Sequence, residues 1–347
     1  MKQLKVCWVS AGVSSFMAGW LEGGDSSTAS AIDADANGKR MNFKERYMKI
    51  GLIDVDGHSG FPNLALCKLS AWHKAKGDSV EWYEPLMSGH MNRVYMSKVF
   101  TFTNDYPYNI DANEVLKGGT GYKDYTTVLP DEIEHSFPDY SIYPNCDYAI
   151  GFLTRGCIRS CPWCVVPKKE GKIRGVATWQ EIKRPDSDKI LFLDNNVLAS
   201  EHGLHQIESI GEVDIKIDFN QGLDARLIDK PVAKLLANCK WVRFIRISCD
   251  TSGMIPIVER AVTNLGEAGV KPYRIFVYTL VQDIDESHER ILAMKDMGLD
   301  VFAQPYRDFD GGEPSLAQKR LANWCNKKSV FKSCTWEEFR NSFKEYA

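Results

Sequence analysis

Three closely spaced cysteines that follow an apolar run constrain this chain more than any other feature. Cys157, Cys161 and Cys164 stand in a C-x3-C-x2-C pattern after the run 148–153, which predicts a buried strand. Thiolates on a short loop suit soft metal centres such as iron–sulfur clusters, zinc and Cu(I). A cluster of four irons takes four ligands, so three local thiolates leave one iron open to a substrate or cofactor.

The pattern Cys157-x3-Cys161-x-Trp163-Cys164 resembles the signature of the radical S-adenosylmethionine (radical SAM) superfamily. The resemblance implies that the three cysteines bind a [4Fe-4S] cluster whose open iron chelates S-adenosylmethionine (SAM), and that Trp163 lies near the adenine. It also implies reductive cleavage of SAM to a 5′-deoxyadenosyl radical, with a flavodoxin or ferredoxin as the electron donor. The protein itself then supplies binding, orientation and exclusion of water.

A zinc site, or a set of structural thiols, is the alternative interpretation of the same cysteines. Structural zinc normally takes four ligands in two pairs. The chain has no second C-x-x-C pair. The number of ligands therefore favours an iron–sulfur cluster.

Length and composition indicate a globular protein with room for two domains. The 347 residues carry a net charge of −3, which gives no overall basic surface for nucleic acid. No apolar run reaches the roughly 18 residues that a membrane span needs. Serines and glycines interrupt the apolar N-terminal segment, so a signal peptide is the weaker interpretation. Most of the ten cysteines are scattered, which fits a reducing, cytoplasmic location.

The N-terminal part of the chain has two predicted regions. Residues 1–48 form an appendage and linker, in which the turn 10–15 distantly resembles the phosphate loop of PP-loop ATP pyrophosphatases. The rest of such a domain is missing, so we do not expect it to bind a nucleotide. Residues 49–147 form a small Rossmann-like parallel α/β domain with its connector. Its predicted elements are strands over 49–55, 80–83 and 94–97, a helix over 62–76 and a glycine turn over 115–122.

The order of elements in residues 49–147 resembles a shortened cobalamin-binding domain. Such a domain precedes the barrel in one group of radical SAM proteins, which includes phage and bacterial members without an assigned substrate. Cobalamin is bound there through a D-x-H-x-x-G loop. The chain has Asp56-Gly57-His58-Ser59-Gly60, which is one residue short. We therefore do not expect cobalamin to bind, and we interpret His58 as a loop residue.

Residues 148–310 alternate regularly between strands and helices, which predicts a parallel sheet. The radical SAM resemblance implies an open, partial (β/α)6 barrel of the TIM type, whose site residues lie at the C-terminal ends of the strands. Strands are predicted over 148–153, 190–193, 215–220, 244–248, 275–281 and 301–304, and helices over 178–183, after Asp229, over 256–266 and over 285–297.

Polar residues follow the second and third of these strands. Asp194 and Asn195 come after the second, where radical SAM proteins have a short motif that meets the SAM amino group. The run from Gln221 to Arg226, Gln-Gly-Leu-Asp-Ala-Arg, comes after the third. It resembles members of the group with a cobalamin-type domain.

The fourth strand offers an arginine that can pair with the SAM carboxylate, and a serine and an aspartate for ribose hydroxyls. Together with the residues above, these complete the predicted cofactor-binding set. Its members are Trp163, Asp194, Asn195, Asp224, Arg226, Arg246, Ser248 and Asp250.

Residues 311–347 show two helical patterns, over 314–326 and after Thr335. Thr335 and Glu338 have the spacing of a capping box. Cys325 and Cys334 are too few for a second cluster, which needs about four cysteines. Packing explains them better.

The sequence thus favours a radical SAM enzyme, whose substrate it does not identify: a peptide, a nucleic acid base or a small molecule. Two other functions stay open. A non-catalytic iron–sulfur redox or sensor protein keeps the three cysteines but needs no polar groups at the strand ends. A zinc-stabilised binding module is colourless, whereas an iron–sulfur protein is brown.

Overall fold

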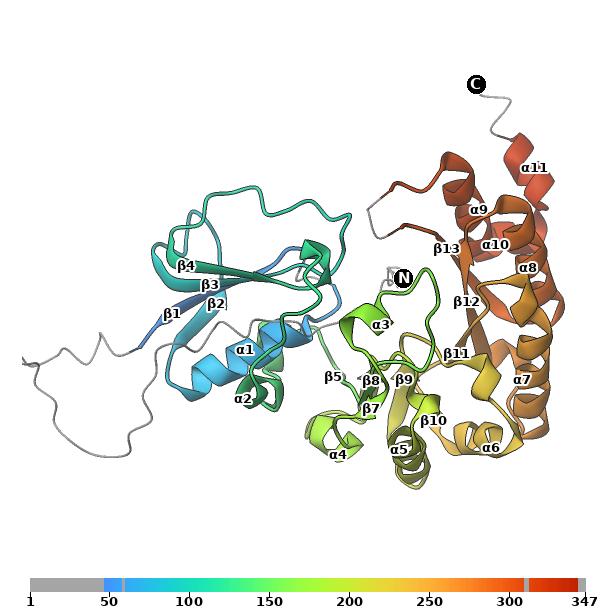
Figure 1. Cartoon of the computed structure of the whole chain (residues 1–347), viewed down its shortest axis with the longest axis horizontal. Helices are drawn as coiled ribbons and strands as arrows, with labels where there is room; N and C mark the ends of the chain where they lie inside the picture. Colours follow the sequence, from blue (N-terminus) through green and yellow to red (C-terminus); the bar gives the residue numbers. More distant parts are fainter. Residues whose placement is uncertain (1–46, 58–59, 309–311, 343–347) are drawn as a thin grey trace, which may run out of the picture. The chain divides into compact units, whose positions relative to one another are not determined.

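The structure is a computed structural model that describes residues 47–57, 60–308 and 312–342. The described chain divides into two compact units, one ending at Cys146 and the other beginning at Asp147. Figure 1 draws the first in blue to green and the second in green to red. The features expected within residues 1–45, and His58 of the short loop, lie outside the described residues.

The first unit is built on four parallel strands in the order β2-β1-β3-β4. Its central strand β1 is an apolar run whose residues 50–53 are all buried, as expected for a strand covered on both faces. Helix α1 connects β1 to β2, and Asn63 caps its N-terminus by accepting a hydrogen bond from Leu66 N. The elements are β1 (Lys49–Asp54), α1 (Leu64–Ala75), β2 (Ser79–Trp82), β3 (Met91–Ser97) and β4 (Ala112–Gly118).

The connector that follows β4 folds onto this first unit. It contains one short helix, α2 (Asp131–Glu134), and two 3-10 turns, η2 (Thr120–Tyr122) and η3 (Tyr140–Ile142). Asp139 accepts hydrogen bonds from Ser70 Oγ and Lys74 Nζ of α1, each at 2.7 Å. Tyr143 donates its hydroxyl to Asp54 Oδ2 at the end of β1, at 2.9 Å. These bonds explain why the unit extends to Cys146.

The second unit contains two parallel sheets and one antiparallel pair. The sheets have the orders β10-β9-β8-β5 and β11-β12-β13, and the antiparallel pair joins β6 to β7. A parallel bridge joins Leu223, which follows β9 in the chain, to Ile247 of β11. The strands are β5 (Ala149–Gly151), β6 (Thr154–Arg155), β7 (Arg174–Gly175), β8 (Lys189–Phe192), β9 (Lys216–Phe219), β10 (Lys240–Trp241), β11 (Ile245–Ser248), β12 (Ile275–Val281) and β13 (Asp300–Pro305).

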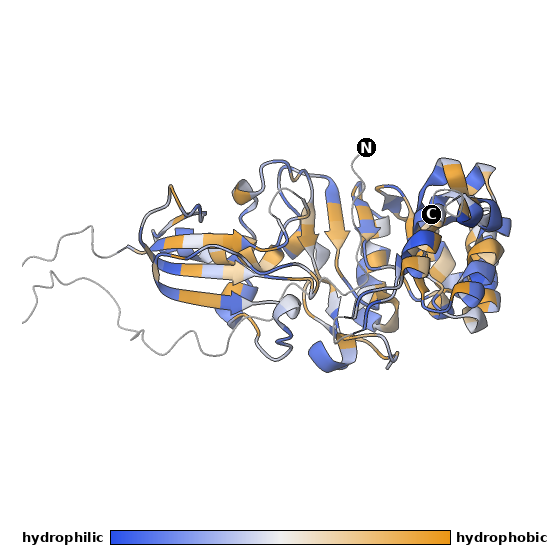
Figure 2. Ribbon diagram, turned by 90° about the horizontal axis from the view of Figure 1, so that it is seen from above, coloured by the Kyte–Doolittle hydropathy of each residue, from blue (hydrophilic) through white to orange (hydrophobic). Residues whose placement is uncertain are grey.

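Amphipathic helices cover these sheets and enclose one large apolar core. Helices α8 and α9 pack on β12 and β13 (Figure 1). In Figure 2 the helices carry both hydrophobic and hydrophilic colours, and the strands combine hydrophobic stretches with shorter hydrophilic ones. The helices are α3 (Val166–Lys169), α4 (Trp179–Ile182), α5 (Glu201–Gly211), α6 (Lys230–Asn238), α7 (Ile255–Glu267), α8 (Ile284–Asp296), α9 (Leu316–Asn326), α10 (Lys328–Ser333) and α11 (Trp336–Asn341).

The expected α/β class with parallel sheets is confirmed, but several elements differ from expectation. The segment predicted as a glycine turn begins inside the strand β4, and the short strands β6, β7 and β10 were not expected. The tail has a third helix, α10, between the two that the sequence predicts. The capping box of Thr335 and Glu338 is present at the start of α11.

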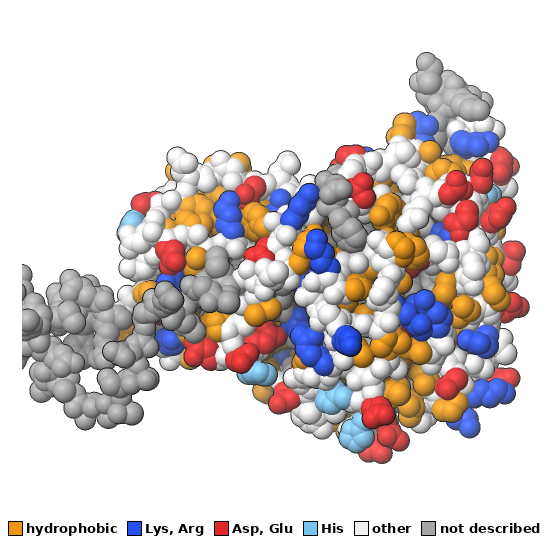
Figure 3. All heavy atoms as spheres, in the orientation of Figure 1, with side chains coloured by type: hydrophobic (Ala, Val, Ile, Leu, Met, Phe, Trp, Pro, Cys, Tyr) orange, Lys and Arg blue, Asp and Glu red, His pale blue; other side chains and the backbone are white. Residues whose placement is uncertain are grey.

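Acidic and basic side chains are interspersed over the face seen in Figure 3, in keeping with the small net charge. Among the described residues, no helix combines the length and the hydropathy that crossing a membrane requires.

A fully buried histidine joins α1 to the sheet of the first unit. His73 Nδ1 lies 2.6 Å from Asp78 Oδ2, and His73 Nε2 lies 2.8 Å from the Tyr95 hydroxyl. A neutral ring satisfies both contacts, since Nδ1–H donates to the carboxylate and Nε2 accepts from the hydroxyl. Burial lowers the pKa of His73 below its ordinary value, against the opposing effect of Asp78.

This histidine makes the stability of the first unit depend on pH. Because the folded pKa is depressed, unfolded His73 binds a proton that the folded residue rejects, and stability falls as pH drops below about 6.5. The loss approaches ~1.4 kcal/mol per pH unit for one proton. We expect hydrogen exchange of the α1 amides, corrected for intrinsic rates, to accelerate between pH 7 and 5.5 in the wild type. His73→Gln should remove most of this difference.

His205→Gln is the matched control, because His205 is exposed on α5 in the second unit. It should leave the pH dependence of α1 exchange as in the wild type. Equal pH dependence in the wild type and His73→Gln would refute the assignment to His73.

Candidate metal centre

The three cysteines lie on an excursion of the chain that is closed at its base by β6 and β7. Thr154 pairs with Gly175 and Arg155 with Arg174 in this antiparallel clasp. Inside it, Cys157 N donates to Gly171 O at 3.1 Å. The cysteine segment therefore begins and ends at one place, at the C-terminal end of β5.

Gly156 makes the turn into the cysteines possible. Its φ is +86°, and a Cβ atom there would lie 2.3 Å from Lys172 O. Only glycine combines the left-handed conformation with so close an approach of two backbone segments. Its N–H donates to Glu170 Oε2 at 2.9 Å.

Two buried acidic residues hold this loop. Asp194, just after β8, accepts from Leu153 N at 3.1 Å, from Thr154 N at 2.6 Å and from Thr154 Oγ1 at 2.7 Å. Burial raises the pKa of Asp194 to about 7, although these hydrogen bonds oppose the rise. Glu170 Oε2 accepts from Asn195 Nδ2 at 2.8 Å in addition to Gly156 N. The sequence predicts that Asp194 and Asn195 bind a cofactor. In the structure their side chains form hydrogen bonds that hold the cysteine loop.

The sulfur atoms of the cysteines receive hydrogen bonds from nitrogen donors. Cys157 Sγ accepts from Arg159 N and from Asn196 Nδ2, each at 3.3 Å. The Arg226 side chain hydrogen-bonds to the Cys161 side chain, and Val166 N donates to the sulfur of Cys164. N–H donors of this kind stabilise thiolate over thiol.

The three thiols are close enough for their charges to interact. Burial raises the pKa of Cys161, and it raises that of Cys164 to about 11. The charge of Cys157 contributes to both shifts in the same direction. No three His, Cys, Asp or Glu side chains in the described parts of the chain are arranged as a ready metal site. The sulfurs are therefore neighbours, and a metal centre bound to all three would have to draw them together.

Asp224 links two arginines and an asparagine beside the cysteines. Its Oδ1 accepts from Arg226 Nε at 2.6 Å and from Arg226 N at 3.1 Å. Its Oδ2 accepts from Arg159 Nε at 3.0 Å and from Asn196 Nδ2 at 3.3 Å. Burial raises the pKa of Asp224, but the guanidinium groups of Arg226 and Arg159 outweigh burial and hold it below its ordinary value.

Arg246 is engaged within the sheet. It donates from Nε and Nη2 to the two oxygens of Asp218 on β9, at 2.6 and 2.7 Å, and from Nη1 to the Tyr278 hydroxyl at 2.9 Å. Asp218 is only 3% exposed, so this is a buried ion pair with bidentate geometry. The structure thus places Arg246 in the support of the sheet, not with the residues around the cysteines.

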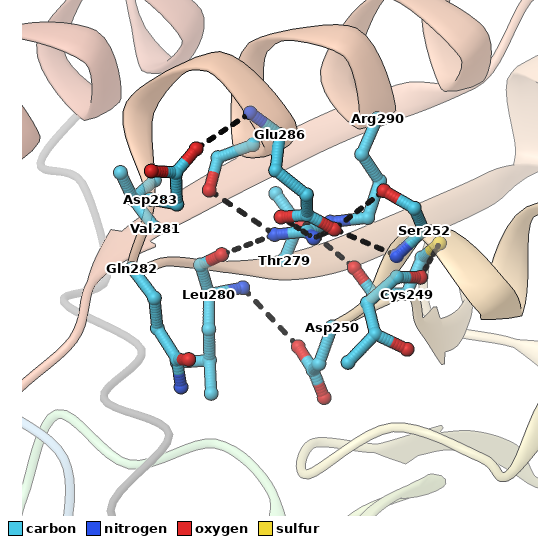
Figure 4. Close-up of polar contacts among 12 residues, drawn as sticks. Cys249, Asp250, Ser252, Thr279, Leu280, Val281, Gln282, Asp283, Glu286 and Arg290 are labelled. Carbon is cyan, nitrogen blue, oxygen red and sulfur yellow. Dashed lines mark hydrogen bonds and ion pairs between the residues drawn. The ribbon is translucent and has the colours of Figure 1, made fainter.

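Asp250 lies beyond the end of β11 and accepts one hydrogen bond, from Leu280 N at 3.1 Å. In Figure 4 its carboxylate points away from the neighbouring network of Glu286, Ser252 and Arg290. Burial raises the pKa of Asp250 to about 6. Its charge raises the pKa values of Cys161 and Cys164, which places it near the cysteine loop.

Trp163 and Ser248 are both half-buried. Trp163 is on the cysteine loop and Ser248 is the last residue of β11. The structure therefore assembles Asp224, Arg226 and Asp250 around the cysteines, and assigns Asp194, Asn195 and Arg246 to supporting contacts.

Sequence reasoning left Asn196 out of the cofactor-binding set. This side chain is 2% exposed, and its Oδ1 accepts no hydrogen bond from the described residues. A buried acceptor without a donor is costly and marks a place where a bound group can donate. The sequence offered one sign of its role, because Asn196 belongs to the polar run Asp194-Asn195-Asn196 at the end of the second predicted strand. Arg159 and Glu170 were also missed, because their roles depend on contacts across the loop.

Comparison with known proteins adds no assignment, since no protein-family model matches the chain and no curated protein matches it significantly. The interpretation of the site rests on its own geometry and chemistry.

The close approach at Gly156 predicts a large effect of a single methyl group. Gly156→Ala adds the strain of a positive φ, roughly 1–2 kcal/mol, to a collision with Lys172 O. We expect faster hydrogen exchange and proteolysis across residues 154–175. Gly171→Ala is the matched control, because Gly171 has a φ of +70° but a Cβ there meets nothing within 4 Å. Equal effects of the two substitutions would show that the contact with Lys172 does not hold the loop.

Proposed function

We propose that this protein is a radical SAM enzyme that binds a [4Fe-4S] cluster through Cys157, Cys161 and Cys164. The observation that carries the proposal is the set of three adjacent thiols on one clasped loop, with nitrogen donors to their sulfur atoms. Soft thiolate ligands suit iron–sulfur clusters, and three of them leave one iron for another ligand. When bound, the cluster and SAM supply reductive cleavage of SAM to a 5′-deoxyadenosyl radical that acts on the substrate.

The residues around the cysteines fit such a cofactor pair. Asn196 Oδ1 is a buried acceptor without a donor among the described residues, and the SAM amino group is a donor of the required kind. Asp250 supplies a half-buried carboxylate suited to ribose hydroxyls, next to Ser248 in the same strand end. Trp163, beside Cys164, offers an aromatic surface to the adenine.

We further propose that the parallel strands β5, β8, β9, β11, β12 and β13 form the partial (β/α)6 barrel of this superfamily. Their order in the two sheets follows the order in the chain, and the Leu223–Ile247 bridge supports continuity between β9 and β11. The cysteine loop and the polar residues follow the C-terminal ends of these strands, where barrel enzymes carry their sites.

The cellular setting follows from the same chemistry. The free cysteines of the described chain and the reduced cluster call for a reducing compartment, for which we propose the cytoplasm. A flavodoxin or ferredoxin is the proposed electron donor. The substrate is a peptide, a nucleic acid base or a small molecule.

The decisive experiment is anaerobic reconstitution with iron and sulfide, followed by SAM and a strong reductant. About four irons per chain and release of 5′-deoxyadenosine support the proposal. Binding of zinc without iron rules out the cluster. Four irons with SAM that neither binds nor reacts indicate an electron-carrying iron–sulfur protein instead.

Each of Cys157→Ala, Cys161→Ala and Cys164→Ala is expected to abolish the cluster and SAM cleavage, because each removes one of three ligands. Cys334→Ala is the matched control, since Cys334 is a half-buried thiol in the C-terminal tail. It should retain the full iron content. Iron content that survives any one of the three loop substitutions contradicts the ligand assignment.

The unpartnered acceptor predicts a specific loss of SAM binding. Asn196→Leu keeps the approximate volume and the three thiolates but removes the acceptor, together with the amide donor to Cys157 and Asp224. A hydrogen bond to a charged group is worth about 1.5–3 kcal/mol, so SAM affinity should fall roughly 10- to 100-fold while iron content is kept. Equilibrium dialysis of SAM against the reconstituted protein without reductant measures this.

Asn195→Leu is the control in the neighbouring position, because the Asn195 amide already donates to Glu170. We expect a smaller change in SAM affinity for this variant. Unchanged SAM affinity in Asn196→Leu would exclude Asn196 Oδ1 as a SAM ligand.

A further inference from the structure

One carboxylate organises donors to two of the three cysteines. Asp224 binds Asn196, which donates to Cys157 Sγ, and Arg226, which hydrogen-bonds to Cys161. We propose that Arg226, positioned by Asp224, sets the reduction potential of the metal centre and makes it easier to reduce. The inference rests on the proposed function, since it requires an iron–sulfur cluster on these cysteines.

The backbone and the side chain of Arg226 are both fixed by the same oxygen. Asp224 Oδ1 accepts from Arg226 N at 3.1 Å and from Arg226 Nε at 2.6 Å. The Arg226 side chain, held in this way, also interacts with the Cys161 side chain. Asp224 is 7% exposed, and its 3-10 turn η5 (Ala225–Leu227) starts directly after it. The guanidinium is thus held in one orientation beside the thiol.

The charge of Arg226 dominates the charges around Cys161. One carboxylate, Asp224, pairs with the guanidinium groups of both Arg159 and Arg226. Asp250 adds a negative charge near Cys161, but the charge of Arg226 acts on this thiol more strongly. The donors to Cys157 and Cys164 described above are neutral amides, whereas the donor to Cys161 is a cation. Arg226 therefore differs from the other donors in charge as well as in position.

A positive charge beside a thiolate ligand favours the reduced state of a cluster. Reduction adds one electron, so the cluster and its thiolates become more negative, and a neighbouring cation stabilises that form more than the oxidised one. Hydrogen bonds to the sulfur atoms act in the same direction. The Arg226 side chain is 34% exposed, so solvent screens part of the effect. Its direct hydrogen bond to Cys161 is screened least.

The test is a redox titration of the reconstituted full chain with a low-potential one-electron reductant, in the absence of SAM. Electron paramagnetic resonance of the reduced cluster gives the midpoint potential. Arg226→Gln removes the charge and keeps a neutral donor, and Arg226→Lys keeps the charge. Arg243→Gln is the matched control: Arg243 is exposed and precedes the N-terminal end of β11, opposite the strand ends that carry the site.

We expect the midpoint potential of Arg226→Gln to be more negative than those of the wild type and Arg243→Gln, at equal iron content. In Arg226→Lys the midpoint potential should return most of the way to the wild-type value, because the positive charge is kept. A merely structural role of the side chain would not produce this difference between the two variants. If Arg226→Gln does not retain its cluster, the comparison of Arg226→Lys with the wild type carries the test, with a smaller negative shift expected.

Two outcomes separate the inference from the proposed function. Potentials that are unchanged in the Arg226 variants, with the cluster intact, overturn the inference and leave the radical SAM proposal standing. A wild-type chain that takes up no iron and sulfide overturns the proposed function itself, and the inference with it.

Discussion

The candidate site depends on the buried carboxylate of Asp194 and its hydrogen bonds to the start of the cysteine loop. Asp194 binds Leu153 N, Thr154 N and Thr154 Oγ1, and so fixes the chain where β5 turns into β6. Bringing the two ends of a long loop together costs conformational entropy, and contacts at the base of the loop must offset this cost. Glu170 provides the second such contact, by binding Gly156 N and Asn195 Nδ2. These acceptors act together with the pairing of β6 and β7, which closes the base of the segment that carries the thiols.

The polar residues at the strand ends divide into two groups with different roles. Arg246 and Asp218 form a buried bidentate pair with Tyr278 at its side, which satisfies polar groups inside the sheet. Removing one partner of such a pair leaves an uncompensated buried charge and destabilises the fold. The pair between Arg246 and Asp218 therefore has a structural role. Asp250 and Asn196, in contrast, each have an oxygen that accepts no hydrogen bond from the described residues. Only this second group offers free hydrogen-bonding capacity to a ligand.

The sequence predicts long, strongly patterned elements well and short or exposed ones poorly. The expected strand 275–281 coincides with β12, and the capping box at Thr335 is where its spacing puts it. Strand β4 was missed because most of its residues are exposed at the edge of the sheet, so no apolar pattern marks it. The clasp of β6 and β7 has two residues in each strand, too few for any periodicity. The sequence also gives no sign that Asp194 and Arg246 are engaged by neighbours, because those contacts join residues far apart in the chain.

Asp224 explains how two arginines stand together beside three cysteines. Unpaired guanidinium groups so close to each other would repel, and a carboxylate between them removes that repulsion while fixing both orientations. A buried carboxylate is itself unstable unless its oxygens are satisfied, and here four donors from Arg226, Arg159 and Asn196 satisfy them. The same bonds orient one neutral and one cationic donor toward Cys157 and Cys161. The residue that makes the arginine pair stable is therefore also the residue that determines which sulfur faces the positive charge.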